Sequence, residues 1–172
     1  GRVIFVGSYS KILSPGIRVG YTIAPKPLSA KLVVAKQVAD VHTNQFFSML
    51  IAEYLTRFDI DAHIDDIRTL YRAKCDRMLA AISEFFPKKV KVYRPDGGLF
   101  IWCELPDGFD GSELCRRAGT KKVAAVPGAA FLVDEKKTSS CIRLNFSMPE
   151  EAQIDKGIEI LGGVIKDYIS RK

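Results

Sequence analysis

Hydrophobic positions recur with helical spacing through much of the first half of the chain. Between residues 28 and 58 the apolar side chains follow each other at intervals of three and four, with a polar interruption at residues 42–45. This pattern predicts two helices joined by a turn. A longer amphipathic pattern over residues 62–85 predicts a third helix, which Pro87 ends. Its predicted apolar face comprises Ile64, Ile67, Leu70, Tyr71, Cys75, Met78, Leu79 and Ile82.

The second half of the chain alternates between short strand-like runs and turns. The predicted strands are residues 90–93, 99–105, 123–126 and 141–146, and the segments between them are rich in glycine and proline. From residue 90 onward we therefore expect an α+β unit, in which helices cover a small sheet.

Two helices accompany these strands. Asp110 and Glu113 have the spacing of a capping box, and they predict a short helix that ends at Gly119. Ser147 and Glu150 have the same spacing before the final helix. The predicted buried face of that helix is Ile154, Ile158, Leu161, Ile165 and Tyr168.

A polar loop near the N-terminus carries the most distinctive chemistry. Apolar residues 3–6 and 19–24 predict two short strands, which Pro25 separates from the first helix. Lys11 lies in the loop between these strands, and Arg18 is expected on the second strand.

The residues around Lys11 favour a site for a phosphorylated aldehyde. A lysine amine attacks an aldehyde only when it is deprotonated, and an ordinary lysine, with a pKa of ~10.4, is protonated at neutral pH. A guanidinium such as that of Arg18 matches phosphate oxygens, and the hydroxyls of Ser8 and Ser10 add further donors. A lone lysine is most often a solvated surface residue, but this combination reverses that expectation. Gly20 is expected to leave room for a ligand.

Arg143 is the second candidate site residue. Strand alternation places Ile142 and Leu144 on one face of the last predicted strand, and Arg143, Asn145 and Ser147 on the other. From the residues alone, a structural ion pair of Arg143 is favoured over recognition of an anion.

Both segments resemble one family. The run Ser8-x-Ser10-Lys11-x-x-x-Pro15-Gly16-x-Arg18-x-Gly20 resembles the lysine signature of the class I/II aminotransferases, which use pyridoxal 5'-phosphate. The run Arg143-Leu144-Asn145-Phe146-Ser147 is similar to the C-terminal strand of the same family. Further segments resemble its kynurenine/2-aminoadipate aminotransferase subgroup: His63-Ile64, Arg68-x-x-Tyr71-x-x-Lys74-x-Asp76, Pro95-x-Gly97-Gly98-x-Phe100-x-Trp102 and Pro127-Gly128-x-x-Phe131.

The resemblance implies a role for each candidate residue. Lys11 is implied to hold pyridoxal phosphate as a Schiff base (an internal aldimine) and to act as general base and acid in the transfer of an amino group from an amino acid to a 2-oxo acid. Ser8 and Arg18 are implied to bind the cofactor phosphate, and Ser10 joins them. Arg143 is implied to bind the α-carboxylate of the substrate. No metal is implied.

The resemblance also implies the fold and its division. We expect an α/β chain with an α+β small domain, the C-terminal part of a fold type I transferase. Residues 1–27 are then the terminal strands of the large cofactor-binding domain, residues 28–86 the interdomain helices, and residues 87–172 the small domain. The chain starts Gly1-Arg2-Val3 without an initiator methionine, so we expect a truncated protein.

A truncated chain is expected to be inactive alone. In the family, the N-terminal part supplies an aromatic ring that stacks on the cofactor and an aspartate that pairs with its ring nitrogen. Two alternatives to an aminotransferase stay open: the effector domain of a helix-turn-helix transcription regulator, and a decarboxylase or lyase of the same fold.

Composition disfavours several other classes of protein and of site. The chain has 172 residues, 47% of them hydrophobic, which is enough for a substantial core. Its net charge of +6 favours a solvated basic surface over nucleic-acid binding. Its four cysteines are widely spaced and form no Cys-x-x-Cys motif, which indicates reduced thiols in a cytoplasmic protein and neither a zinc site nor a disulfide framework. No apolar run is long enough to cross a membrane, and the intact protein is expected to be a homodimer.

Overall fold

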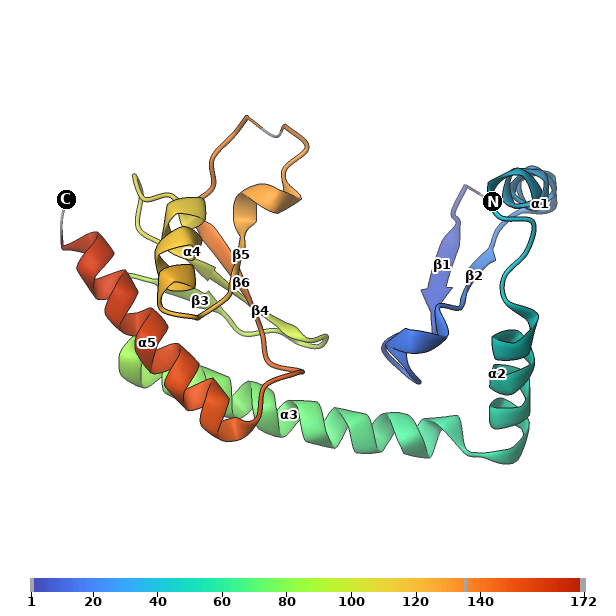
Figure 1. Cartoon of the computed structure of the whole chain (residues 1–172), viewed down its shortest axis with the longest axis horizontal. Helices are drawn as coiled ribbons and strands as arrows, with labels where there is room; N and C mark the ends of the chain where they lie inside the picture. The colour runs from blue at the N-terminus through green and yellow to red at the C-terminus, as the bar shows by residue number, and fades with distance from the viewer. Residues whose placement is uncertain (1, 135, 171–172) are drawn as a thin grey trace. The chain divides into compact units, whose positions relative to one another are not determined.

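The chain divides after Ile67 into two compact units. The computed structural model describes residues 2–134 and 136–170, and Figure 1 shows their helices and strands. The long helix α3 (Ile60–Phe85) begins in the first unit and continues into the second. Each unit is described by itself below.

The first unit combines a strand pair with helices. Its elements in chain order are β1 (Phe5–Ser8), the 3-10 turn Pro15–Ile17, β2 (Gly20–Ile23), α1 (Lys26–Ala39), α2 (Gln45–Arg57) and the start of α3. The strands are antiparallel, and Ser8 lies opposite Gly20. Asn44 caps α2 because its side chain accepts a hydrogen bond from the Phe47 amide. The two predicted helices, their interruption and the long third helix are confirmed.

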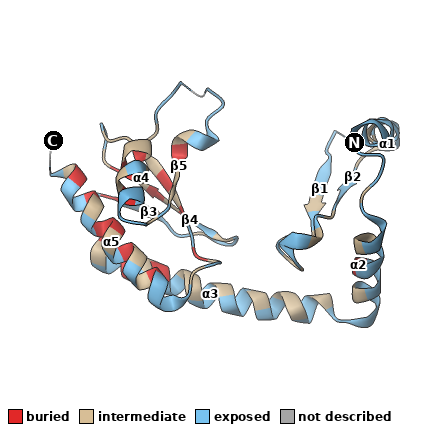
Figure 2. Ribbon diagram, viewed as in Figure 1, coloured by how far each residue is buried: buried red, intermediate tan, exposed pale blue. Residues whose placement is uncertain are grey.

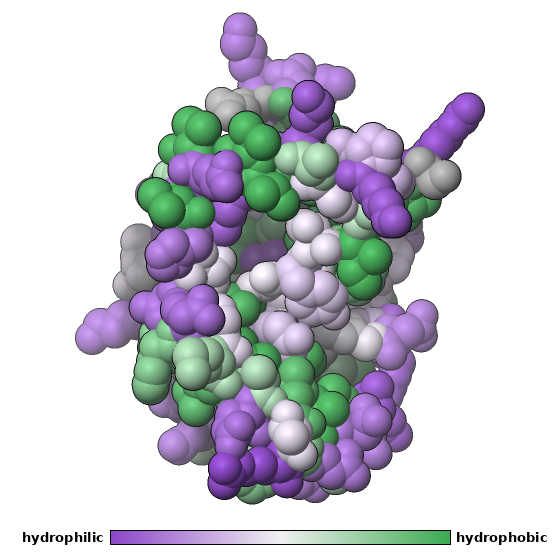
Figure 3. All heavy atoms as spheres, turned by 90° about the vertical axis from the view of Figure 1, so that its right-hand side faces the viewer, coloured by the Kyte–Doolittle hydropathy of each residue, from purple (hydrophilic) through white to green (hydrophobic). Residues whose placement is uncertain are grey.

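Most apolar side chains of the first unit are exposed in this chain. Among its described residues, Ile51 of α2 is the only one that is buried. Val38 and Phe46, which lie in the helical pattern of the sequence, are 85% and 68% exposed. Figure 2 shows how little of this unit is buried, and Figure 3 shows apolar side chains on its surface. The spacing thus predicted the helices correctly, but their apolar faces are not covered within residues 2–67.

The second unit is the predicted α+β arrangement. Its elements after α3 are β3 (Lys91–Tyr93), β4 (Phe100–Glu104), α4 (Gly111–Thr120), β5 (Val126–Pro127), the 3-10 turn Gly128–Phe131, β6 (Cys141–Asn145) and α5 (Glu151–Ile169). The strands form an antiparallel sheet in the order β3-β4-β6-β5. The expected strand at residues 123–126 is wrong in its position, because pairing with β6 involves only Val126 and Pro127.

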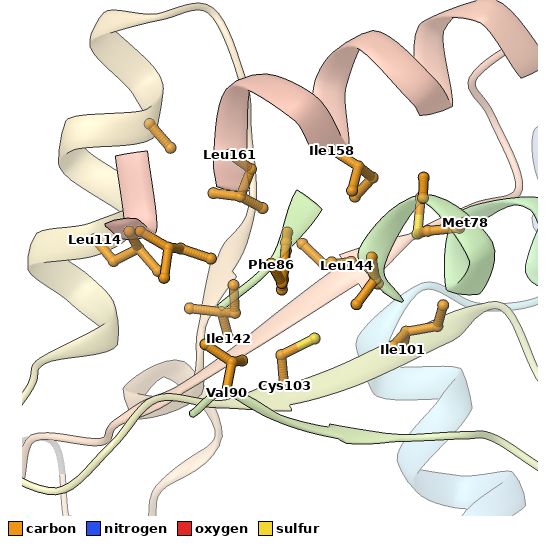
Figure 4. Close-up of a cluster of buried hydrophobic side chains, with 14 of the residues drawn as sticks. Met78, Phe86, Val90, Ile101, Cys103, Leu114, Ile142, Leu144, Ile158 and Leu161 are labelled. Atoms are coloured by element: carbon orange, nitrogen blue, oxygen red, sulfur yellow. The ribbon is translucent and has the colours of Figure 1, made fainter. Parts of the chain in front are cut away.

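One face of this sheet closes a hydrophobic core. Ile101 and Cys103 of β4 and Ile142 of β6 are fully buried, and Leu144 is nearly so. Helices α3, α4 and α5 contribute most of the other members of the cluster, including Met78, Leu114, Ile158 and Leu161 (Figure 4). All five predicted apolar residues of α5 are buried. The prediction for α3 holds in its C-terminal half, where Tyr71, Cys75, Met78, Leu79 and Ile82 belong to the core or pack against it, whereas Leu70 is 54% exposed.

The cap of α4 differs in part from the prediction. Asp110 is the N-cap, and its side chain accepts a hydrogen bond from the Ser112 amide at 2.9 Å. Glu113 does not complete a capping box. Its carboxylate bonds the guanidinium groups of Arg116 and Arg117, which lower its pKa to about 2.

The predicted capping box before α5 is wrong by three residues. Glu150 is the N-cap, and it forms a capping box with Gln153. Ser147 instead donates its hydroxyl to Asn145 Oδ1 at 2.9 Å, and the same oxygen accepts a bond from the Ser147 amide. Asn145 therefore organises the turn that leaves β6.

All four cysteines are free thiols. Burial raises the pKa of Cys103 to about 12 and that of Cys115 to about 11, because a thiolate is disfavoured away from water. Within the described part of the chain, every helix is too short or too polar to span a membrane.

Candidate functional site

The loop that carries Lys11 is closed by backbone hydrogen bonds. The Tyr9 amide donates to the Val19 carbonyl at 3.1 Å, just beyond the paired ends of β1 and β2. The Leu13 amide donates to the Tyr9 carbonyl at 2.9 Å and forms a turn around Lys11. The Lys11 side chain is exposed, and the structure gives its amine no hydrogen bond or ion pair to any residue of the described ranges.

Ser8, Ser10 and Arg18 lie together beside this turn. The Ser10 amide donates to Ser8 Oγ at 3.2 Å. Arg18 Nη1 lies 3.3 Å from Ser10 Oγ and donates to the Pro15 carbonyl at 3.1 Å. The structure thus brings together three of the four residues predicted from the lysine loop, and the fourth, Lys11, follows Ser10 directly.

Arg18 does not lie on a strand, so this part of the prediction is wrong. It follows the 3-10 turn Pro15–Ile17 as its C-cap, with left-handed backbone angles of φ 51° and ψ 39°, and β2 begins only at Gly20. A non-glycine residue in this conformation costs about 1–2 kcal/mol. The turn, and not strand alternation, therefore directs the guanidinium toward Ser10.

Gly7 and Gly20, at the two ends of the loop, are closely packed. A Cβ atom at Gly20 would lie 2.8 Å from the Gly7 carbonyl oxygen on the neighbouring strand. A Cβ atom at Gly7 would lie 2.4 Å from the ring of Tyr21. The close approach of the two strands is a direct structural reason for glycine at position 20, and the expectation that Gly20 leaves room for a ligand stays a prediction.

Arg143 lies in the middle of β6, on the face of the sheet opposite the core. Its neighbours Ile142 and Leu144 are buried, as the alternation predicted. The expected structural ion pair is not found, because no carboxylate of the described residues pairs with this guanidinium. Its Nε atom is buried and has no hydrogen-bond partner. A buried donor without a partner is costly, and this favours anion recognition over a structural role.

Two aromatic rings contact the Arg143 guanidinium. Its Cζ atom lies 3.9 Å from the centre of the Phe100 ring and 4.5 Å from that of Phe131. The sequence motif included both residues without assigning either of them a role. Phe100 could have been inferred from cross-strand geometry, because it lies on the same face of β4, diagonal to Arg143. Phe131 lies in a 3-10 turn, where no periodic pattern predicts its position.

Comparison with known proteins places these features in one family. The family model described as aminotransferase class I and II matches residues 1–161. The aromatic-amino-acid aminotransferase 1 of Thermococcus litoralis is 39% identical over 171 residues, which is 99% of this chain and 41% of that protein.

Two solved structures agree with this result. The alpha-aminoadipate aminotransferase of Thermus thermophilus, complexed with N-(5'-phosphopyridoxyl)-L-leucine, has a TM-score of 0.93 at 38% identity, over 99% of this chain and 43% of that one. The kynurenine aminotransferase of Pyrococcus horikoshii, in complex with PMP, has a TM-score of 0.91 at 41% identity, over 97% of this chain and 41% of that one. The fold is therefore that of the fold type I aminotransferases, and the chain spans about two fifths of the length of these relatives.

The family model covers most of the chain and includes both Lys11 and Arg143. The chain belongs to the class I and II aminotransferase family.

Proposed function

We propose that this chain is part of a pyridoxal phosphate-dependent aminotransferase, which transfers an amino group from an amino acid to a 2-oxo acid. The observation that carries the proposal is the grouping of Ser8, Ser10 and Arg18 beside Lys11. Family membership supports it, as do the phosphopyridoxyl and PMP complexes of the two related structures.

The residues of the lysine loop fit the cofactor. Its phosphate needs several donors at one place, and the Arg18 guanidinium and Ser10 hydroxyl lie 3.3 Å apart, with Ser8 Oγ bonded to the Ser10 amide. Its aldehyde needs an amine, and the Lys11 amine has no partner among the described residues. We therefore assign phosphate binding to Ser8, Ser10 and Arg18, and covalent attachment to Lys11. When bound, pyridoxal phosphate supplies an electron sink for the carbon that loses its proton.

Lys11 would then act on the substrate. Once its amine is free, Lys11 Nζ is the base that takes the proton from the substrate Cα and later returns it as an acid. A single group that serves both steps must stay close to the reacting carbon, and the hydrogen-bonded turn around Lys11 restricts its backbone accordingly.

Arg143 would orient the substrate. A guanidinium binds a carboxylate through two parallel hydrogen bonds, which fixes both the position and the direction of the group. Holding the α-carboxylate in this way orients the Cα–H bond for proton removal. The unpartnered, buried Nε of Arg143 supports this assignment.

The remaining assignments follow the family. We propose a cytoplasmic homodimer, in which residues 1–27 belong to the large domain, residues 28–86 to the interdomain helices and residues 87–172 to the small domain. The exposed apolar side chains of α1 and α2 support burial against further protein. The regulator has less support, because the related aminotransferases described above are 38–41% identical to this chain, whereas helix-turn-helix regulators of Bacillus subtilis and Escherichia coli are only 26% and 28% identical. The decarboxylase or lyase has less support because the related proteins described above are named as aminotransferases.

Replacement of Lys11 tests the proposal. In the whole protein that carries this chain, Lys11→Ala is expected to lower transamination by about 10²–10⁴-fold, the usual contribution of a positioned general base. The amino-acid and oxo-acid products are measured by mass spectrometry with 2-oxoglutarate as acceptor, which also separates transamination from decarboxylation. Lys31→Ala, which removes an exposed lysine of α1, is the matched control and should leave the rate unchanged. A Lys11→Ala protein that transaminates at the parent rate contradicts the proposal.

A further inference from the structure

The half-buried Arg143 side chain, whose Nε atom is fully buried, lies against aromatic rings and has no ion pair among the described residues. Its guanidinium carbon lies 3.9 Å from the Phe100 ring centre and 4.5 Å from the Phe131 ring centre. Cation–π contacts at these distances are attractive, and they strengthen where water is excluded. The rings accept no hydrogen bond from the N–H groups of Arg143. They therefore fix the guanidinium and leave its N–H groups free to donate to a ligand.

Such an arrangement suits a receptor for a carboxylate. A long arginine side chain loses considerable rotational freedom when it is fixed, and a ligand that must fix it binds more weakly. Here that ordering is provided before the ligand arrives. Ion pairs with protein carboxylates would provide it too, but they would also compete with the ligand for the same donors.

Both rings are placed by regular secondary structure of the second unit. Phe100 begins β4, where it lies opposite Asn145 and diagonal to Arg143. Phe131 ends the turn Gly128–Phe131, and its ring packs edge-on against that of Trp102, with 5.6 Å between ring centres. Trp102 itself lies directly opposite Arg143 in the sheet.

The turn that carries Phe131 is tightly packed. A Cβ atom at Gly128, where the turn begins, would lie 2.6 Å from Ser139 Oγ and 2.7 Å from the Cys141 Cβ atom. This turn therefore has little freedom to shift. Phe131 is nevertheless 49% exposed and Phe100 36% exposed, so neither residue serves mainly to fill the core.

We propose that Phe100 and Phe131 are positioning residues for substrate binding, which hold the Arg143 guanidinium in the orientation that receives the α-carboxylate of the amino acid and the 2-oxo acid. This inference rests on the proposed function of Arg143. The two rings act through Arg143 and take no part in proton transfer. Their loss should weaken the binding of every substrate that carries this carboxylate, whatever its side chain.

Steady-state kinetics of the whole protein test the inference. Phe131→Leu and Phe100→Leu keep an apolar side chain but remove the ring, and each is expected to raise KM for the amino acid and for the 2-oxo acid about two- to fivefold, the size of a partly exposed cation–π contact. kcat at saturation and the absorbance of the bound cofactor should not change. Phe131→Tyr and Phe100→Tyr keep an aromatic ring, and both variants should have the KM of the parent protein.

Tyr93→Leu is the matched control. Tyr93 is an exposed aromatic residue of the same sheet, opposite Trp102, and its hydroxyl bonds Glu104. Its replacement should leave both KM values unchanged. Unchanged KM values in both phenylalanine variants, or an equal rise in Tyr93→Leu, overturn the inference.

Arg143→Met separates this inference from the proposed function. If Arg143→Met leaves KM unchanged, the proposed role of Arg143 is wrong, and the inference is overturned with it. If Arg143→Met raises KM but the two leucine variants do not, only the positioning role is overturned. NMR of the unchanged protein provides a test that needs no variant to fold, because an Arg143 Nε–H signal that lacks an aromatic ring-current shift also contradicts the inference.

Discussion

Each unit of the chain contributes one arginine to the candidate site residues, and the two arginines are fixed by different means. Arg18 in the first unit is exposed, has a left-handed backbone and is fixed by hydrogen bonds to Ser10 Oγ and the Pro15 carbonyl. Arg143 in the second unit lies in a regular strand and is flanked by Phe100 and Phe131. A turn with hydrogen-bond partners therefore fixes the position of Arg18, whereas a strand of a packed sheet fixes the position of Arg143.

Burial explains this difference. Residues 68–170 contain nearly the whole buried core of the described chain, whereas residues 2–67 contribute only Ile51. A four-stranded sheet with a core beneath it is stable by itself, and it fixes the backbone of the strand that carries Arg143. The lysine loop lies on a two-stranded sheet, so local hydrogen bonds and the close approach of Gly20 to Gly7 must fix its shape.

The largest expected contrast between the units is in the effect of core truncation. Leu161 is fully buried in α5, and Leu161→Ala should lower the free energy of unfolding by about 2–5 kcal/mol, because it leaves a cavity. Leu50 in α2 is 48% exposed, and Leu50→Ala should change the free energy of unfolding by about 0.5 kcal/mol or less.

Urea unfolding measures both variants. The single tryptophan, Trp102, lies in β4, so its fluorescence reports on the second unit, and circular dichroism follows both units. Equal losses of stability in the two variants would show that the burial contrast between the units does not hold in solution.

A smaller effect on stability is expected when either of two adjacent glycines of α5 is replaced by alanine. A Cβ atom at Gly162 would lie 2.6 Å from the Phe85 carbonyl oxygen, so Gly162→Ala should destabilise the second unit by about 1–3 kcal/mol. A Cβ atom at Gly163 meets nothing within 4 Å, so Gly163→Ala should stabilise the helix by about 0.5–1 kcal/mol. Thermal unfolding of the two variants measures both changes in stability. Changes of the same sign would contradict the tight contact between α5 and the end of α3.

Periodicity predicted most of the elements because helices and strands bury regular sets of residues. The stripe from Ile154 to Tyr168 and the alternation around Arg143 are examples, and both are confirmed. The left-handed conformation of Arg18 could not be predicted in this way, since nothing in the spacing of residues shows which one ends a 3-10 turn.

Other features depend on which side chains compete for one group, or on contacts distant in sequence. Glu113 matched a capping box by spacing, but Arg116 and Arg117 compete for its carboxylate. The partner of Arg143 was expected to be a carboxylate, whereas the structure places two aromatic rings there. The exposure of Phe46 and Val38 could not be predicted either, because a helical pattern does not show whether the same chain covers the apolar face.

The assignment of Lys11 as the residue that holds the cofactor has a direct chemical test. The whole protein is incubated with pyridoxal phosphate and reduced with borohydride, which makes attachment to a lysine permanent, and the modified peptide is identified by mass spectrometry. We predict a phosphopyridoxyl group on Lys11, and no comparable site of modification in a Lys11→Ala protein. Modification spread over many surface lysines, and unchanged by Lys11→Ala, would contradict the assignment.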